Sequence, residues 1–334
     1  MTYSSGSQIL ASDYNTFTTT AGGLNDIWST GSGDKGWGQT TFTAVTAGTD
    51  TVTATQWATL VNNLSTSGSQ TNTTITSRTA PVTGNVVAIL ANVAADITSV
   101  TTNRGNAAAS GTQYGTFTGT TSKTTATGSG TSAWTITFTH TVTFADANSA
   151  RYFFNAGGLV RLQYGKSSTG TDTDPDWNTL AGKCGSIYFS GRVNSAAQTI
   201  AGVSYTGTTR VGGSGGTQTT LTTTTGWYTL VAGAAATTIF QLTNDVSPYS
   251  GEYIRTTAAI NAGSTVLTLV TTWVSDGSSG AGTSANISGG TATSSPSTTI
   301  TGTAPTTLVT YIPPSSTYLT TASWGTPTIA ASVA

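Results

Sequence analysis

The spacing of apolar positions changes once along the chain. Before about residue 105, apolar residues recur every three or four positions, which is the period of an amphipathic helix; after about residue 133 they alternate with polar residues, as in a half-buried strand. The chain is therefore expected to be mainly β. We expect a small N-terminal helical module, residues 1–105, followed by an antiparallel β-sandwich or jelly-roll-like domain, residues 133–334. Residues 106–132, rich in Gly, Thr and Ser, are expected to form a linker or a loop-rich first strand.

The first helical segment contains Leu10, Tyr14, Phe17, Ala21, Leu24 and Trp28. Ser12 is its expected N-cap, and Gly22 and Gly23 predict a break. The second segment repeats the first, because ATQWATL at 54–60 aligns with ASDYNTF at 11–17. Thr55 is its expected cap, and the helix continues through Val61 and Leu64.

A third helix is expected in TGNVVAILANVAADITSV, where Val86, Leu90, Val93, Ile97 and Val100 keep the helical period. Two interpretations of these apolar stripes are open. The stripes form a core within the module, or one of them docks on a neighbouring subunit.

The strand period is clearest in AWTITFTHTVTF at 133–144. One face carries Trp134, Ile136, Phe138, His140, Val142 and Phe144, and the other face carries threonines. Further strands are expected at 151–156, 159–165, 186–191, 199–206, 227–232, 237–243, 252–259, 265–274 and 307–312. Many short strands separated by turn residues are typical of a sandwich.

The stretch RYFFNAGGLVRLQYG at 151–165 combines arginines and aromatic residues around a Gly-Gly pair. Glycine supplies the positive φ of a tight reversal. Alternation on both sides of the pair predicts a β-hairpin.

Charge adds limits on function. Charged residues make up 7% of the chain, against about 25% in an ordinary domain. There is no basic stripe, so nucleic acid is not an expected partner. No apolar stretch approaches the roughly 20 residues of a membrane span. The eight Trp, twelve Tyr and nine Phe favour ordered cores over disorder.

The few reactive groups are isolated. His140 is the only histidine and Cys184 the only cysteine, and both are expected to be packed structural residues. No cofactor is expected. Asp172, Asp174 and Asp176 alternate in TDTDPDW and are weak calcium candidates, but a solvated loop capping a helix that begins near Trp177 explains them equally well.

Aromatic rings and carboxylates leave two further hypotheses. Exposed aromatic side chains stack on sugar rings, and the candidates are Trp37, Trp177, Tyr205, Trp227 and Trp273. Glycoside hydrolysis needs two placed acids, while Glu252 is the single glutamate and the aspartates fall mostly in predicted loops.

Several motifs resemble those of virion structural proteins of tailed phages, notably phages of marine and cyanobacterial hosts. They are GSGDKGWGQ at 31–39, with the helical segments ASDYN and ATQW beside it; Asp146 with ARYFFNAGG at 150–158 and Val160–Arg161; D-x-DWNTLAGKCGSIYFSG at 174–191; and VTYIPPSSTYLTTASWGTP at 309–327. The resemblance covers most of the chain and carries no catalytic residue.

This resemblance implies a non-enzymatic particle component: a tail fibre, a baseplate-associated protein or another surface appendage, assembled in the host cytoplasm and located in the virion. Its partners would be other virion proteins and copies of itself, with a homotrimer as the first expectation from the habit of fibres. A host-receptor adhesin that binds glycans is the alternative, and a polysaccharide depolymerase is the second alternative.

Overall fold

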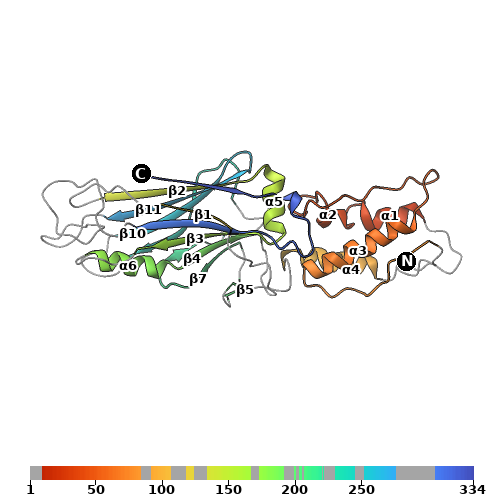
Figure 1. Ribbon diagram of the computed structural model, residues 1–334, viewed down its shortest axis with the longest axis horizontal. Coiled ribbons are helices and arrows are strands. Elements are labelled where there is room, and N and C mark those ends of the chain that lie inside the picture. The colour runs from red at the N-terminus through yellow and green to blue at the C-terminus, as the bar shows by residue number, and fades with distance from the viewer. Residues whose placement is uncertain are drawn as a thin grey trace.

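The protein is elongated, with helices at one end and two β-sheets at the other (Figure 1). This architecture is seen in a computed structural model. The structure describes residues 10–83, 92–106, 118–123, 134–166, 173–191, 199–200, 203–204, 207–219, 221, 230–244, 252–275 and 305–334. The prediction of a mainly β protein with a small N-terminal helical part is confirmed.

The helical part consists of α1 (Ala11–Thr18), α2 (Asn25–Trp28), α3 (Ala54–Gln70), α4 (Val93–Thr102) and the 3₁₀ turn η1 (Arg104–Asn106). The Trp57 ring is fully buried and meets the Tyr14 ring edge to face at a centroid distance of 5.6 Å. The predicted break at Gly22 is confirmed, because α1 ends before it and α2 begins after it.

Both predicted helix caps are wrong by two residues. α1 begins at Ala11, so Ser12 lies inside the helix, and Leu10 takes the N-cap position without a side-chain bond. α3 is capped by Thr53, whose side chain accepts from the backbone of Gln56 while the Gln56 side chain returns to the backbone of Thr53. This reciprocal capping box is a stronger start signal than Thr55 alone.

The apolar stripes form a core within the protein. Of the first stripe, Tyr14, Phe17, Leu24 and Trp28 are buried, whereas Leu10 and Ala21 are exposed. The third helix begins at Val93, with Val93, Ile97 and Val100 buried. Val86 and Leu90 lie outside the described residues.

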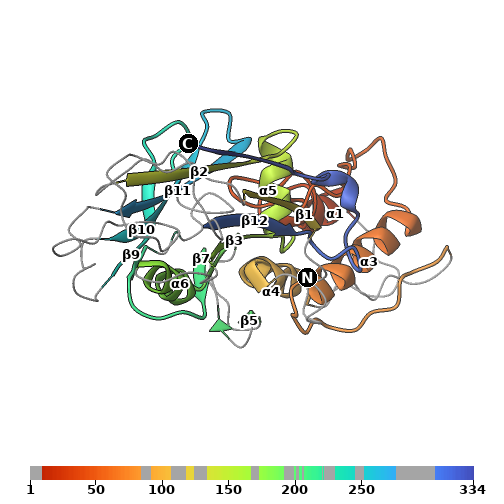
Figure 2. The same cartoon turned by 60° about the vertical axis from the view of Figure 1, so that its left-hand side comes forward.

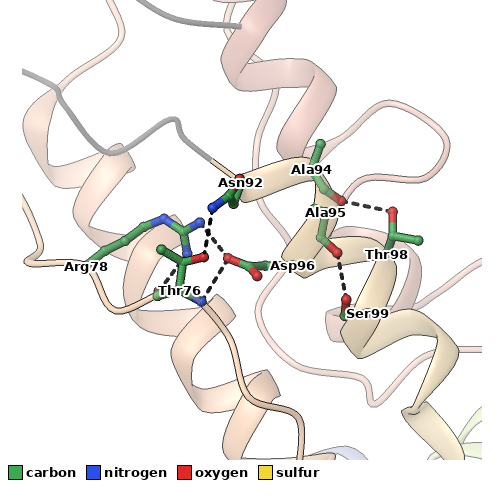
Figure 3. Close-up of polar contacts among 8 residues, drawn as sticks. All are labelled: Thr76, Arg78, Asn92, Ala94, Ala95, Asp96, Thr98 and Ser99. Atoms are coloured by element: carbon green, nitrogen blue, oxygen red, sulfur yellow. Dashed lines mark hydrogen bonds and ion pairs between the residues drawn. The ribbon is translucent and has the colours of Figure 1, made fainter.

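One ion pair fixes the segment between α3 and α4 (Figure 3). Arg78 Nη2 lies 2.5 Å from Asp96 Oδ2, and the two side chains are only 5% and 11% exposed. The same carboxylate oxygen accepts from the backbone N–H of Thr76 at 3.2 Å. The extended segment is thereby attached to the first turn of α4.

The strands form two antiparallel sheets and one short two-stranded pair. The first sheet has the order β1-β12-β3-β4-β7, and the second has the order β13-β2-β11-β10-β9-β8. Their bounds are β1 Thr118–Lys123, β2 Trp134–Thr143, β3 Leu159–Gly165, β4 Ser186–Ser190, β7 Thr208–Val211, β8 Thr217–Gln218, β9 Thr237–Thr243, β10 Tyr253–Ile260, β11 Val266–Ser275, β12 Thr306–Ile312 and β13 Thr328–Val333; β5 (Thr199–Ile200) pairs with β6 (Val203–Ser204).

The two large sheets pack face to face as a sandwich. Phe138 of β2, Leu162 of β3 and Tyr311 of β12 belong to one buried core. Hydroxyl groups cross the space between the sheets, as where Tyr164 Oη lies 2.8 Å from Thr256 Oγ1. The same core includes Tyr14 and Trp57, so the helices and the sandwich share one hydrophobic interior.

The hairpin prediction for 151–165 is wrong in its first half, where a helix replaces the expected strand at 151–156. α5 (Ala147–Asn155) begins with the Asp146 side chain accepting from Ser149 N at 2.7 Å. It ends in a Schellman motif, in which the N–H groups of Gly157 and Gly158 bond to the carbonyls of Phe154 and Phe153. Gly157, at φ +103°, reverses the chain after a helix instead of between strands.

Most other strand predictions are confirmed within one residue, including β2, β3, β4, β9, β10, β11 and β12. The region predicted at 199–206 contains the short pair β5 and β6. Of the strand predicted at 227–232, residues 230–232 are not in a strand, and 227–229 lie outside the described residues. β1 lies in the segment predicted as a linker or first strand, and β13 was not predicted.

Helix α6 (Thr173–Cys184) contributes to the same interior. Its Trp177 ring lies against Trp273 of β11 at a centroid distance of 5.6 Å, and both rings are fully buried. The prediction that the helix begins near Trp177 is wrong by four residues, so Asp174 and Asp176 belong to the helix and not to a preceding loop.

Candidate functional site

Three segments far apart in the sequence meet where the helices join the sandwich. They are the loop at 30–39, the helix α5, and the segment at 320–324, which contains the 3₁₀ turn η2 (Thr321–Ser323). We call this contact the joint. In Figure 1, α5 lies between the strands on one side and α1 to α3 on the other.

The loop folds on itself before it meets α5. Gly36 has φ +108°, and a Cβ at this position would lie 2.5 Å from the carbonyl oxygen of Thr30. The N–H of Gly38 donates to Ser29 O at 2.7 Å. Glycine is required here because the chain passes back against its own backbone.

Asn155, the last residue of α5, forms hydrogen bonds with the backbone of this loop. Its amide nitrogen donates to the carbonyl oxygens of Asp34 and Gly36, at 2.9 and 3.1 Å. In return, the indole nitrogen of Trp37 donates to the carbonyl oxygen of Asn155 at 3.2 Å. The end of α5 is thereby bonded to the loop in both directions.

Arg151, one turn earlier on α5, makes a second set of contacts with the same loop. Its guanidinium donates to Gly33 O at 2.7 Å and to Thr30 O at 2.8 Å. The guanidinium also lies 5.1 Å from the ring centroid of Tyr152. Charge-assisted hydrogen bonds of this kind are stronger than neutral ones. Arg151 therefore fixes the loop against α5.

Gln39 connects the loop to the C-terminal segment. Its side-chain oxygen accepts from the backbone N–H of Thr320 at 2.9 Å, and its side-chain nitrogen donates to Ser323 Oγ at 3.0 Å. Gly38 lies between α5 and the segment 320–324, because a Cβ there would meet the Tyr152 ring of α5 at 2.5 Å and Ser323 Cβ at 2.7 Å.

The polar contacts of the joint hold the three segments in place and do not resemble a catalytic site. Most acceptors are main-chain carbonyls, and one ion pair joins Arg104 to Asp34 at 3.3 Å. A further buried bond runs from the Gln70 side chain at the end of α3 to Ala156 O at 3.0 Å. Together these contacts hold the helical part against the sandwich in one arrangement.

The joint brings together three of the four motifs that were singled out in the sequence, since GSGDKGWGQ, ARYFFNAGG and TTASWG all contribute to it. Sequence reasoning missed the positioning roles of Asn155, Arg151 and Gln39. The high number of glycines in the loop indicates a tightly folded loop, but it does not indicate which segment the loop contacts.

The predicted sugar-stacking aromatics are wrong where the structure describes them. Trp37 is 1% exposed and belongs to the joint, while Trp177 and Trp273 are fully buried in the sandwich. None of these three rings offers a face to a ligand. Tyr205 and Trp227 lie outside the described residues.

His140 and Cys184 are both buried, as expected of packed residues. Burial lowers the pKa of His140 to about 4, against an opposing effect of the Thr307 backbone, and neither ring nitrogen has a hydrogen bond of normal geometry. Burial raises the pKa of Cys184 to about 12, with nearby Arg210 opposing the shift. A thiol that stays protonated is a poor nucleophile.

The calcium hypothesis gains no support from the part of the chain that can be described. Within it, no group of three or more His, Cys, Asp or Glu side chains is placed to hold a metal ion. Asp172 lies outside that part, as do the side chains of Asp174 and Asp176. Glu252, the candidate for glycoside hydrolysis, is 1% exposed.

A surface hollow of about 550 Å³ lies at the β8–β9 margin of the second sheet. Its lining is mostly hydroxyl and amide, from Thr217, Thr219, Thr238, Gln241 and Thr243, with Gly216 and Leu242. None of the described residues that line the hollow is a predicted site residue.

Among the helices that the structure describes, none has the length and apolar character needed to cross a membrane.

Comparison of the chain with known protein families, with curated proteins and with solved structures gives no match.

Proposed function

We propose that this chain is a non-enzymatic structural subunit of a tailed-phage virion: a tail fibre, a baseplate-associated protein or another surface appendage. The helical part attaches to the particle or to sibling chains, and the sandwich packs in the assembly or projects from it. The subunit is made in the host cytoplasm and works in the virion.

The observation that carries the proposal is the composition of the joint. Three of the four motifs on which the resemblance to virion proteins rests supply its loop, its helix and its C-terminal segment, whereas the motif at 174–191 lies in α6 and β4. Their side chains bond to main-chain carbonyls and set one module against the other. Residues used in this way serve architecture, which is the task of a particle component.

The elongated form is a second support. The helical part, α1 to α4, and the sandwich lie at opposite ends of the long axis, with α5 between them (Figure 1). A subunit of this form presents one end for attachment and the other for projection.

The test is proteomic. Particles of the phage that encodes this chain are purified on a density gradient and analysed by quantitative mass spectrometry beside the infected-cell lysate. We expect the chain to co-purify with the major virion proteins at a fixed copy ratio. A chain that is abundant in the lysate and missing from intact particles contradicts the proposal.

A parallel assay addresses the enzyme alternative. Purified protein is incubated with host capsular polysaccharide, and the reducing ends are counted. We expect no increase above buffer. A release of oligosaccharides that a Glu252→Gln variant loses would assign the chain to the depolymerases instead.

A further inference from the structure

The outer face of the second sheet has an unusual composition. Because alternate residues of a strand point to the same side, the register of the strands defines this face. Val270 pairs with Thr139 of β2 and with Thr257 of β10, and these residues point away from the core. We call this surface the threonine face. Its residues are Thr135, Thr137, Thr139, Thr141 and Thr143; Val266, Thr268, Val270, Thr272 and Val274; Tyr253, Arg255, Thr257 and Ala259; Thr238, Gln241 and Thr243; and Thr328, Ala330 and Ser332.

The threonine face is open to solvent. Thr135, Thr143 and the outward residues of β13 are exposed, and the outward residues of β10 and β11 are half-buried. The outer face of the first sheet differs, because Leu159, Tyr188 and Ile312 form a small cluster that is already buried there. Figures 1 and 2 show β2, β11 and β10 side by side, with β13 beside β2.

The chemistry of this face is that of a protein interface. Its described residues include one charged side chain, Arg255, whose guanidinium lies 5.5 Å from the ring centroid of Tyr253. The outward valines of β11 form an apolar stripe along the middle. Interface cores are depleted in charge, and β-branched side chains have few rotamers to lose on association.

The area of the face is close to what a specific contact needs. A residue in a sheet covers about 3.4 by 4.8 Å, so β13, β2, β11, β10 and β9 together present roughly 650 Å² before side-chain relief is counted. Specific interfaces bury about 800 Å² on each partner. The observed spread is roughly 600–1,000 Å² on each partner, so this face lies within it when the whole face is covered.

We propose that the threonine face is the contact between two copies of this chain, packed face to face about a two-fold axis. A face with Arg255 as its one described charge is compatible with a second copy of itself, whereas a strongly charged partner needs complementary charges that the described residues of this face lack. Val270 lies on the middle strand and the middle row of the face. A two-fold axis that runs through Val270 along or across the strands keeps the two Arg255 groups apart, and a self-complementary patch closes as a dimer.

This inference goes beyond the proposed function, since it concerns the purified chain and holds whether or not the chain is found in virions. It differs from the homotrimer expected from fibres, because a face that meets its own copy about a two-fold axis produces pairs.

The test is sedimentation equilibrium of the full chain. We expect a mass twice the 33.6 kDa of one chain. Val270→Lys, which puts a charge at the centre of the face, is expected to give the single-chain mass. Ser65→Lys, which adds the same charge on the exposed side of α3, is the matched control and is expected to keep the dimer.

A second variant keeps the inference testable if Val270→Lys fails to fold. In Thr139→Cys, the introduced thiol is the one accessible to maleimide, because Cys184 is buried. We expect its labelling rate to fall at least tenfold as the protein concentration rises through the dimerisation range. A wild-type chain that sediments as a monomer or a trimer overturns the inference. A thiol protected only after host polysaccharide is added overturns it too and assigns the face to a glycan.

Discussion

His140 occupies a position that suits its neutral form only. Its ring is fully buried, its neighbours across the sheet are Leu269 and Ala331, and burial lowers its pKa to about 4. In the unfolded chain the same group titrates near 6.5. The unfolded state therefore takes up a proton first as the pH falls, so the stability contributed by neutral His140 is complete above pH 6.5 and is lost towards pH 4.

This linkage gives a prediction for the wild type and His140→Leu. Between pH 7 and pH 4 the wild type is expected to lose roughly 3 kcal/mol more of its unfolding free energy than the variant. Urea denaturation across this pH range measures the difference. His140 is the only histidine, so no second imidazole confuses the comparison, and two parallel curves would contradict the burial argument.

Asp96 is a second residue whose contribution to stability depends on its buried surroundings. Its carboxylate pairs with Arg78 (Figure 3), and both side chains are nearly buried. Removing one member of such a pair leaves the other unpaired in a desolvated place. The pair is therefore sensitive to the loss of either partner.

We expect Asp96→Ala to lower the free energy of unfolding by about 3 kcal/mol. Lys35→Ala is the control, because Lys35 and Asp26 are 3.8 Å apart with a larger exposed fraction; a change below about 1 kcal/mol is expected there. Chemical denaturation of both variants at neutral pH tests the contrast. Equal losses would show that burial of the Arg78 pair has no special effect.

At the scale of elements, α5 shows how a local pattern misleads. A run of aromatic residues beside Gly-Gly fits alternation as well as it fits a helix, and the flanking residues decide. Asp146 caps the helix start and Gly157 ends it in the left-handed region. These cap signals are present in the sequence, but the predicted hairpin used only the glycine pair.

Gly158 gives the test of this helix end. Its backbone is not in the left-handed region, but a Cβ there would lie 2.5 Å from the Phe153 ring. Gly158→Ala is therefore expected to cost about 1–3 kcal/mol through overpacking. Gly182 in α6 faces open space, so Gly182→Ala is expected to stabilise by about 0.5–1 kcal/mol.

Thermal denaturation of the two variants measures both effects. We expect Gly158→Ala to lower the melting temperature and Gly182→Ala to raise it. If Gly158→Ala is as stable as the wild type, the close packing of Phe153 on the reversal does not limit this site.

Strands were easier to predict than the joint for a physical reason. β2 and β10 each bury one face, so alternation in the sequence reports their burial directly. The joint depends on Asn155 meeting a loop about 120 residues away and Gln39 meeting a segment about 280 residues away. No local period encodes such a contact, and the glycines of the loop indicate a tight path without naming what it touches.

At the scale of the whole molecule, the joint and the shared core make one cooperative unit. Residues of the helices and of both sheets belong to the same buried cluster. Differential scanning calorimetry of the wild type is therefore expected to show one transition with equal calorimetric and van't Hoff enthalpies.

In Gly38→Ala the added Cβ would meet Tyr152 of α5 and Ser323 of the C-terminal segment and force them apart. The helical part and the sandwich are then expected to unfold in two separate transitions. Gly33 is the control: it also has a positive φ, but a Cβ there meets nothing within 4 Å. Gly33→Ala is expected to lower the transition temperature and keep a single peak. Two peaks already present in the wild type would contradict the joint.

The most direct test of the central claim, that this chain is an architectural part of a virion, is a cryo-electron microscopy map of the intact particle. We expect density for the whole elongated chain, with the helical end against its neighbours in the particle and the joint in the arrangement described above. A complete map in which every ordered protein is accounted for by other chains would contradict the account.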